Sequence, residues 1–314
     1  MRELTITAND AGQRLDRFLQ KALPSLPGTL AQKYIRTKRI KVDGKRTERS
    51  YRLSEGDTIQ LYIGDEFFEQ VPDQGLYRSI AQPNLSICYE DEHLLLVNKA
   101  PGILCHSSTD PKEVTLVDLV KAYLYQSGAW NPDAEQSFVP ALSNRLDRNT
   151  GGLVIAAKSA ASQRILNEKL REGEIDKYYL LAVQGCPVPD SGRIEGHLVK
   201  DRANNIVHVA EAHEADAKAA VLAYQTLKTA EDLSLVECKL ITGRSHQIRV
   251  QMASLGTPIL GDRKYGGGTA EPYQALWAYR LRFAFTSEAG ALEYLNGREF
   301  RGVEPPFVRR YFGI

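Results

Sequence analysis

The sequence has few cysteines, no long apolar run, no internal repeat and no low-complexity tract. Its four cysteines, Cys88, Cys105, Cys186 and Cys238, lie far apart in 314 residues and form no Cys-x-x-Cys pair. This spacing indicates neither a zinc site nor a redox dithiol, so we expect reduced thiols and no metal. No stretch supplies the roughly 20 apolar residues that a membrane span requires, and the N-terminus has no apolar signal core. We therefore expect a cytoplasmic protein with no membrane partner.

The chain has almost no excess of either charge, yet its charges are unevenly distributed. The formal net charge is +1, but residues 1–62 hold 13 Lys or Arg against 7 Asp or Glu, a net charge of +6. The remaining residues hold 27 against 32, a net charge of −5. A basic N-terminal part on a mildly acidic body predicts contact with a polyanion, although surface charge can also serve solubility alone. The length favours two domains.

Residues 1–63 have the pattern of a small domain with two helices and a hairpin. We predict helices over 13–23 and 30–38 and strands over 40–42 and 58–63. Asp43 and Gly44 form a dipeptide that tolerates positive φ, so we expect a tight turn after the strand at 40–42. Basic side chains gather on the second helix and at its exit, as an electrostatic footprint for phosphates requires: Lys33, Arg36, Lys38 and Arg39.

Three segments of this part resemble an S4 RNA-binding domain over about 50 residues. They read GQRLDRFL at 12–19, IR at 35–36 and IKVDGK at 40–45. The resemblance implies that this small α/β domain binds RNA. A basic solvated helix without a ligand is the alternative.

Residues 64–84 lose periodicity and include Pro72, Gly75 and Pro83, so we predict an interdomain linker. Residues 85–314 then form the larger domain. We predict strands over 85–89, 94–97, 178–183, 194–199, 221–227, 233–240 and 277–285, and helices over 115–125, 159–171 and 245–255. Strands dominate and helices are scattered among them without strict alternation. This pattern favours an α+β fold with a mixed, largely antiparallel central sheet.

The segment SNRLDRNTGGLVIAA at 143–157 sets one carboxylate between two arginines, directly before a Gly-Gly turn and an apolar run. The apolar run indicates a buried strand, so we expect Asp147 to lie where this rigid strand begins. Paired glycines let a backbone turn sharply or approach a ligand closely. The pattern alone makes Asp147 a candidate, because solvated charges before a hairpin would look similar.

Several segments of the larger domain together resemble the RluA family of RNA pseudouridine synthases. They are NKAPG at 98–102, NRLDRNTGGL at 144–153, KYYLLAVQG at 177–185, TGRSHQIRV at 242–250, LGTPILGD at 255–262 and YG at 265–266. They follow one another in the expected order within about residues 85–285. The resemblance implies an enzyme that isomerises uridine in RNA to pseudouridine without a cofactor or a metal.

The resemblance also implies roles for single residues. Asp147 would be the nucleophile, Arg249 its ion-pair partner, and Tyr179 would stack on the uracil. Arg145, with Asn144 beside it, would contact the RNA at the gap that the extruded nucleotide leaves. Asn144 stands where the family pattern has His, and Gly151 where it has Ser. We expect these departures to alter RNA contacts or turn geometry without loss of activity.

Other functions remain open at this point. A glycosidase usually needs two acids, and the Asp147 motif offers one, since Glu174 and Asp176 have no motif support. A non-catalytic RNA-binding or ribosome-assembly protein would keep the first domain and an inert body. The two-domain arrangement looks like the enzymes that modify large-subunit ribosomal RNA, whereas relatives modify transfer RNA. We take ribosomal RNA as the expected partner and a monomer as the expected state.

Overall fold

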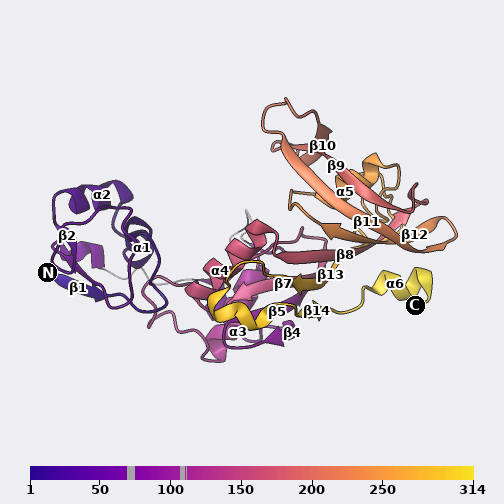
Figure 1. The fold of residues 1–314 in the computed structure, drawn as a ribbon. Helices are drawn as coiled ribbons and strands as arrows, with labels where there is room; N and C mark the ends of the chain where they lie inside the picture. The colour runs from indigo at the N-terminus through magenta and orange to yellow at the C-terminus, as the bar shows by residue number, and fades with distance from the viewer. Residues whose placement is uncertain (69–74, 107–109, 111) are drawn as a thin grey trace. The chain divides into compact units, whose positions relative to one another are not determined.

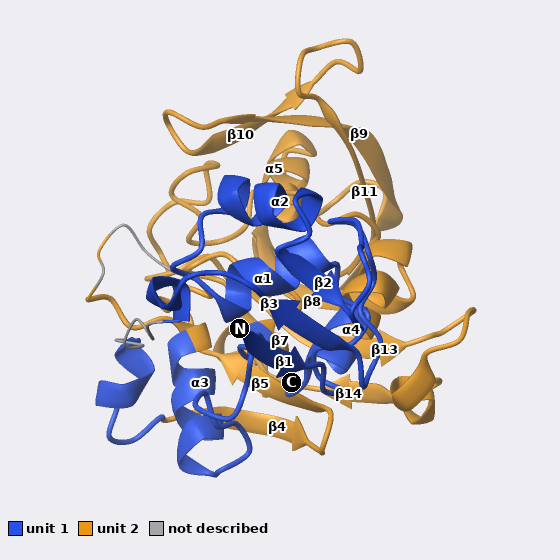
Figure 2. Ribbon diagram, turned by 90° about the vertical axis from the view of Figure 1, so that its left-hand side faces the viewer, with its two compact units in different colours: residues 1–83, 118–141, 157–164 blue, residues 84–117, 142–156, 165–314 orange. Residues whose placement is uncertain are grey.

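The computed structural model describes residues 1–68, 75–106, 110 and 112–314. The chain divides into two compact units (Figure 2). Unit 1 consists of residues 1–83, 118–141 and 157–164, and unit 2 of residues 84–117, 142–156 and 165–314. In the described part of the chain, no helix has the length and apolar character that crossing a membrane demands.

Unit 1 contains a small antiparallel sheet and two short helices. The strands are β1 (Arg2–Thr5), β2 (Ile40–Val42) and β3 (Thr58–Leu61), in the order β1-β3-β2, and the helices are α1 (Leu15–Ala22) and α2 (Gly28–Arg36). Phe18, Leu19 and Ile59 are buried in a core that the helices and the sheet share. Asp43 and Gly44 have φ of 50° and 72°, which confirms the turn predicted after β2.

The predicted linker at 64–84 falls partly on residues 69–74, which lie outside the described residues. Its described part holds two 3-10 helices, Asp65–Phe68 and Leu76–Ser79. Tyr77 is buried against the rings of Tyr125 and Trp130. Whether 64–84 acts as a linker stays a prediction.

Unit 2 is organised by a large mixed sheet (Figure 1). Its strands are β4 (Ser86–Glu90), β5 (Leu94–Lys99), β6 (Ala141–Leu142), β7 (Gly151–Ala157), β8 (Ile175–Gln184), β9 (Ser191–Asp201), β10 (Ile206–Ala210), β11 (Lys218–Ala230), β12 (Leu233–Leu240), β13 (Leu276–Phe283) and β14 (Glu299–Arg301). The main path runs β10-β9-β11-β12-β8-β13-β7-β5-β4, with β14 on β13 and β6 on β7. Strands β13 and β7 pair in parallel, whereas β8 pairs antiparallel with both β12 and β13. The predicted α+β class with a largely antiparallel sheet is confirmed.

Helices α3 (Leu116–Gln126) and α4 (Ala160–Glu172) have residues in both units, and unit 2 also contains α5 (Gln247–Ser254) and α6 (Pro306–Phe312). The hydroxyl of Ser159 accepts the backbone N–H of Ser162 at 3.1 Å, so Ser159 caps α4. Helix α5 begins two residues later than predicted, because His246 has φ of 51° and cannot continue a right-handed helix. Strands β6, β10 and β14 and helix α6 were not predicted from the sequence.

Strand β7 carries the chain out of the Asp147 segment, and all seven of its residues are buried. Gly151 and Gly152 pair with Trp277 and Ala278 of β13. Gly152 has φ of 114°, and a Cβ at this position would overlap the backbone of Ala278. Only glycine therefore fits where β7 enters the sheet.

We predict that Gly152→Ala destabilises the protein by about 3 kcal/mol or more, because positive φ and a backbone clash act together. Gly196→Ala is the matched control, since Gly196 lies in β9 with open space around its Cβ position. Its effect should stay within about 1 kcal/mol. Urea denaturation of both variants measures the difference, and equal midpoints would contradict the account of β7.

Candidate active site

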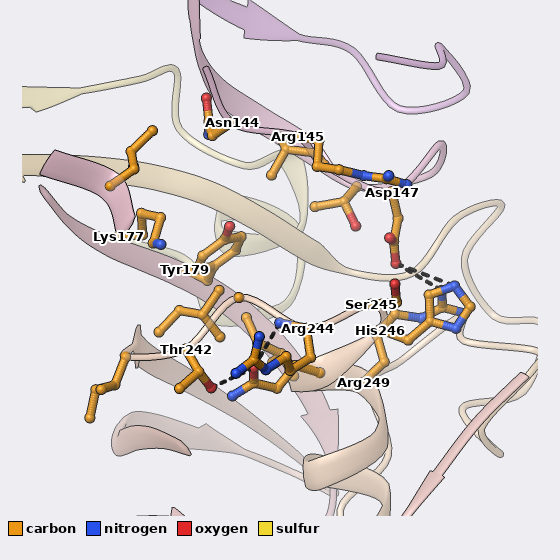
Figure 3. A pocket seen from close by; sticks show the side chains of 18 of the residues that line it. Asn144, Arg145, Asp147, Lys177, Tyr179, Thr242, Arg244, Ser245, His246 and Arg249 are labelled. Carbon is orange, nitrogen blue, oxygen red and sulfur yellow. Dashed lines mark hydrogen bonds and ion pairs between the residues drawn. The ribbon is translucent and has the colours of Figure 1, made fainter. Parts of the chain in front are cut away.

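A cavity of about 760 Å³ opens in unit 2 around the Asp147 segment. Figure 3 shows that its walls come from the segment before β7, from β8 and from the segment that leads into α5. The predicted residues Asn144, Arg145, Asp147, Tyr179 and Arg249 all line it. Residues about 100 positions apart in sequence thus meet in one cavity. Its volume lies within the range of small-molecule sites.

An ion pair joins Asp147 to Arg249. The Nη1 of Arg249 donates to Oδ2 of Asp147 at 3.0 Å, which places the predicted counter-charge beside the carboxylate. The same guanidinium donates to both carboxylate oxygens of Asp262, from Nε at 2.7 Å and from Nη2 at 2.8 Å. Asp262 is 1% exposed and Arg249 8% exposed, so this second pair is buried. Asp262 therefore fixes the plane of Arg249, and Arg249 fixes Asp147.

The charge balance of Arg249 follows from these contacts. Burial would lower the pKa of Arg249, but its hydrogen bonds to Asp262 and Asp147 and the charges of these carboxylates outweigh burial and raise the pKa. The guanidinium is thus always charged. It places a fixed positive charge 3.0 Å from the Asp147 carboxylate.

His246 also lies near Asp147, with its Nε2 4.0 Å from Oδ2, the oxygen that Arg249 contacts. Its Nδ1 lies 2.7 Å from the hydroxyl of Tyr265, and that hydroxyl accepts the backbone N–H of Val207 at 2.9 Å. Burial lowers the pKa of His246 more than the nearby Asp147 charge raises it, so the imidazole is neutral at neutral pH. The guanidinium of Arg249 lies over the ring of Tyr265, with Cζ 5.0 Å from the ring centroid. Tyr265 thus supports both neighbours of Asp147.

Tyr179 projects from β8 into the cavity and is 6% exposed. Burial, and next the charge of Asp147, raise the pKa of its phenol. The side chain is therefore a neutral ring and a neutral hydroxyl in the same cavity as the carboxylate. A flat apolar face with one polar end suits stacking on a planar heterocycle.

Lys99 holds the backbone next to Asp147. The residue is 1% exposed, and its ammonium donates to the carbonyl oxygens of Ala100, Ile103 and Arg148 at 3.0, 2.8 and 2.8 Å. Burial lowers the pKa of Lys99 to about 8, so the charged form with three donors still predominates at neutral pH. The backbone N–H of Thr150 also donates to the carbonyl of Asp147 at 3.1 Å, which closes the turn.

The two departures from the family pattern have local explanations. The side-chain Oδ1 of Asn144 accepts the backbone N–H of Ile155 at 2.8 Å, and its Nδ2 donates to the carbonyl of Leu153 at 3.4 Å. Asn144 therefore fastens the Asp147 segment to β7, and a role for it in RNA contact stays a prediction. At Gly151, a Cβ would overlap the ring of Trp277. The Trp277 ring therefore occupies the space that the side chain of a larger residue at position 151 would need.

Among the described residues that line the cavity, Asp147 is the single acid. Glu174 is instead buried in an ion pair with Lys169 at 2.7 Å, and Asp176 pairs with Lys239 at 2.8 Å. Neither of these carboxylates lines the cavity, so the two-acid arrangement of a typical glycosidase is not built here. Arg145 lines the cavity and is exposed, so its side chain is accessible to a ligand.

A second cavity, of about 660 Å³, lies in unit 1 between α2 and the segment after β2. We call it the basic groove, because it is lined by Lys33, Arg36, Arg46 and Arg49 against the single acid Glu48. Two of the four predicted phosphate-binding residues therefore share this groove. Lys38 and Arg39 do not line it, and Arg39 lies over the ring of Tyr34.

The sequence analysis assigned no role to Asp262, Tyr265 or Lys99, although all three lie within the quoted motifs. The signal for Lys99 is a charged residue that ends the apolar strand β5. Asp262 follows a Pro-Ile-Leu-Gly turn, and no spacing rule links it to Arg249, 13 residues earlier. Met252 of α5 is fully buried and does not line the cavity.

Known protein families match both parts of the chain. Residues 93–254 match the model of the RNA pseudouridylate synthase family, and residues 13–59 match that of the S4 domain. The chain is 32% identical over 280 residues to the ribosomal large subunit pseudouridine synthase C of Rickettsia bellii, covering 86% of this chain and 88% of that protein. It is 30% identical over 301 residues to an uncharacterized RNA pseudouridine synthase of Mycoplasma capricolum, covering 95% and 96%.

The fold also matches a solved structure, that of human RNA Pseudouridylate Synthase Domain Containing 4. The TM-score is 0.56 at 23% identity, over 74% of this chain and 92% of that chain. At this identity the likeness concerns the fold alone.

We predict that Tyr265→Phe destabilises the protein by about 1–3 kcal/mol, because the buried N–H of Val207 and the Nδ1 of His246 both lose their partner. Tyr273→Phe is the control, since Tyr273 is exposed and its hydroxyl can turn to water. Its effect should lie within about 0.5 kcal/mol. Urea denaturation compares the two variants, and a Tyr265→Phe protein as stable as Tyr273→Phe would contradict the role of the hydroxyl.

Proposed function

The chain belongs to the RluA family of RNA pseudouridine synthases, and from this premise we propose that it modifies large-subunit ribosomal RNA with Asp147 as the nucleophile. The observation that carries the proposal is the single acid of the cavity, held at 3.0 Å by a guanidinium that is itself anchored in the core. A nucleophilic carboxylate must be aimed at the atom that it attacks, and this arrangement holds Asp147 in one position.

The proposed reaction needs one carboxylate and no cofactor. The Asp147 carboxylate attacks C1′ of the ribose while the C1′–N1 bond breaks, and the electron pair of that bond stays on the uracil. The uracil turns within the cavity, and its C5 attacks C1′ and displaces the carboxylate. C5 then releases its proton and N1 takes up one, so atoms and charges balance. Because no water enters the product, a second acid to activate water is unnecessary.

The other residues of the cavity serve this reaction by position. Tyr179 stacks on the uracil during its rotation, and Arg145 contacts the strand from which the nucleotide was extruded. Arg249 holds Asp147 through an ion pair that is largely shielded from water. His246 and Tyr265 limit the directions in which the carboxylate can move.

The S4 domain supplies a separate grip on RNA. The basic groove presents three arginines and one lysine, whose charge suits phosphates. Guanidinium groups can bind phosphate oxygens through two parallel hydrogen bonds. Ribosomal RNA is the proposed partner because a relative 32% identical over 86% of the chain bears the name ribosomal large subunit pseudouridine synthase C.

We predict that the purified protein releases tritium from a large-subunit ribosomal RNA transcript made with 5-tritiated uridine. Asp147→Asn should lower this release by about three orders of magnitude or more, because the amide is a poor nucleophile. Its affinity for the transcript should change less than about threefold. Asp190→Asn is the control, since Asp190 is exposed and does not line the cavity.

Wild-type release from Asp147→Asn would contradict the nucleophile. Release from transfer RNA and none from the ribosomal transcript would contradict the proposed target. Sequencing the product for pseudouridine identifies the modified position in either case.

We predict that Arg36→Met weakens RNA binding at low salt. Plotted as the logarithm of affinity against the logarithm of salt concentration, the slope should become shallower by about 0.7–0.9, the effect of one lost phosphate contact. Arg309→Met removes one exposed charge from α6, outside both cavities, and should leave the slope unchanged. A slope that is the same in Arg36→Met and the wild type would contradict the role of the basic groove.

A further inference from the structure

The active-site cavity contains far more positive than negative charge. Five cationic side chains line it, Arg145, Arg171, Lys177, Arg244 and Arg249, against the single carboxylate of Asp147. Residues 63–314 nevertheless carry a net negative charge. A cavity lined by charge of one sign concentrates oppositely charged ligands. The part of this positive charge that no carboxylate of the protein offsets favours an anionic ligand.

The contacts of these cations distinguish Lys177 from the others. Arg249 is occupied by two carboxylates, and the Nε of Arg244 donates to the carbonyl of Ala219 at 2.9 Å. Arg171 pairs with its neighbour Glu172 at 3.4 Å and is mostly exposed. Arg145 is exposed, where water can solvate it.

Lys177 is half-buried, and no carboxylate among the described residues lies within ion-pair distance of its ammonium. The neighbouring Asp176 pairs with Lys239. Burial lowers the pKa of Lys177 more than the nearby charge of Asp176 raises it. A half-buried ammonium that lines a cavity and forms no ion pair at contact distance can bind an anionic group of a ligand there.

The position of Lys177 specifies which part of the ligand it meets. Lys177 and Tyr179 lie two residues apart on β8, and Figure 3 shows both side chains at the cavity. Residues i and i+2 of a strand share a face and stand about 7 Å apart. A nucleotide whose base stacks on Tyr179 can therefore bring a backbone phosphate to Lys177. Phosphate is the anionic group that RNA carries.

We propose that Lys177 forms a phosphate subsite of the active site, which binds a phosphodiester group flanking the extruded uridine. This inference deepens the proposed function, since it rests on Asp147 and Tyr179 marking the place of the nucleotide. Lys177 binds the substrate and takes no part in bond making. Its charge offsets that of the phosphate as the nucleotide leaves solvent.

The test compares the affinities of the full-length protein for uridine, 5′-UMP and 3′-UMP, measured by ligand-observed NMR titration at low salt. The wild type should bind at least one of the two monophosphates about tenfold more tightly than uridine, the effect of one charge-assisted hydrogen bond. The tighter of the two shows which flanking phosphate Lys177 meets. In Lys177→Met the ratio of monophosphate affinity to uridine affinity should fall to about one. The affinity for uridine itself should stay within about twofold of that of the wild type.

Two further variants complete the test. Lys177→Arg keeps the charge and should retain most of the preference, and Arg309→Met should retain all of it. Equal affinity of the wild type for uridine and both monophosphates would overturn the subsite. Persistence of the preference in Lys177→Met would also overturn it, as would an equal loss of uridine and monophosphate binding, which would place Lys177 against the base.

The outcome is separate from that of the proposed function. A protein that prefers a monophosphate through Lys177 but does not modify the ribosomal transcript keeps the subsite and loses the proposed target. A protein that modifies the transcript without this preference keeps the target and loses the subsite.

Discussion

The buried pair between Arg249 and Asp262 is the interaction on which the active site depends. Asp262 accepts two hydrogen bonds from one edge of the guanidinium, from Nε and Nη2. This leaves Nη1 to donate to Asp147 at the cavity wall. Removing one member of a buried ion pair typically costs about 3–5 kcal/mol, because the other charge stays buried without a partner. The arrangement therefore couples the aim of a catalytic group to the stability of the core.

The backbone around Asp147 is fixed by a second set of contacts, which involve no charge on the nucleophile itself. Lys99 donates hydrogen bonds to three carbonyl groups, including that of Arg148. Asn144 accepts the backbone N–H of Ile155 and so joins the same segment to β7. Gly152 then lets β7 enter the sheet against the backbone of Ala278. Side-chain and backbone constraints thus converge on one carboxylate, as precise positioning of a reacting group requires.

Much of this could be predicted from the sequence, for identifiable reasons. The turn at Asp43 and Gly44, the Ser159 cap and the buried strand after Gly152 follow from local rules, and motif resemblance brought Asp147, Tyr179 and Arg249 together. Asp262 and Tyr265 were missed because their roles depend on contacts to other segments that no periodicity encodes. The short strands β10 and β14 were not predicted, because they are strands through pairing with longer neighbours rather than through local propensity.

The most direct measurement is the turnover of Asp262→Asn on the RNA substrate. Asp262 does not line the cavity, and its carboxylate is joined to Asp147 through the guanidinium of Arg249. The account predicts that kcat falls by about 10- to 100-fold while KM stays nearly constant, since the aim of Asp147 is loosened but the RNA contacts remain. A folded Asp262→Asn protein with wild-type kcat would contradict the claim that this anchor positions the nucleophile.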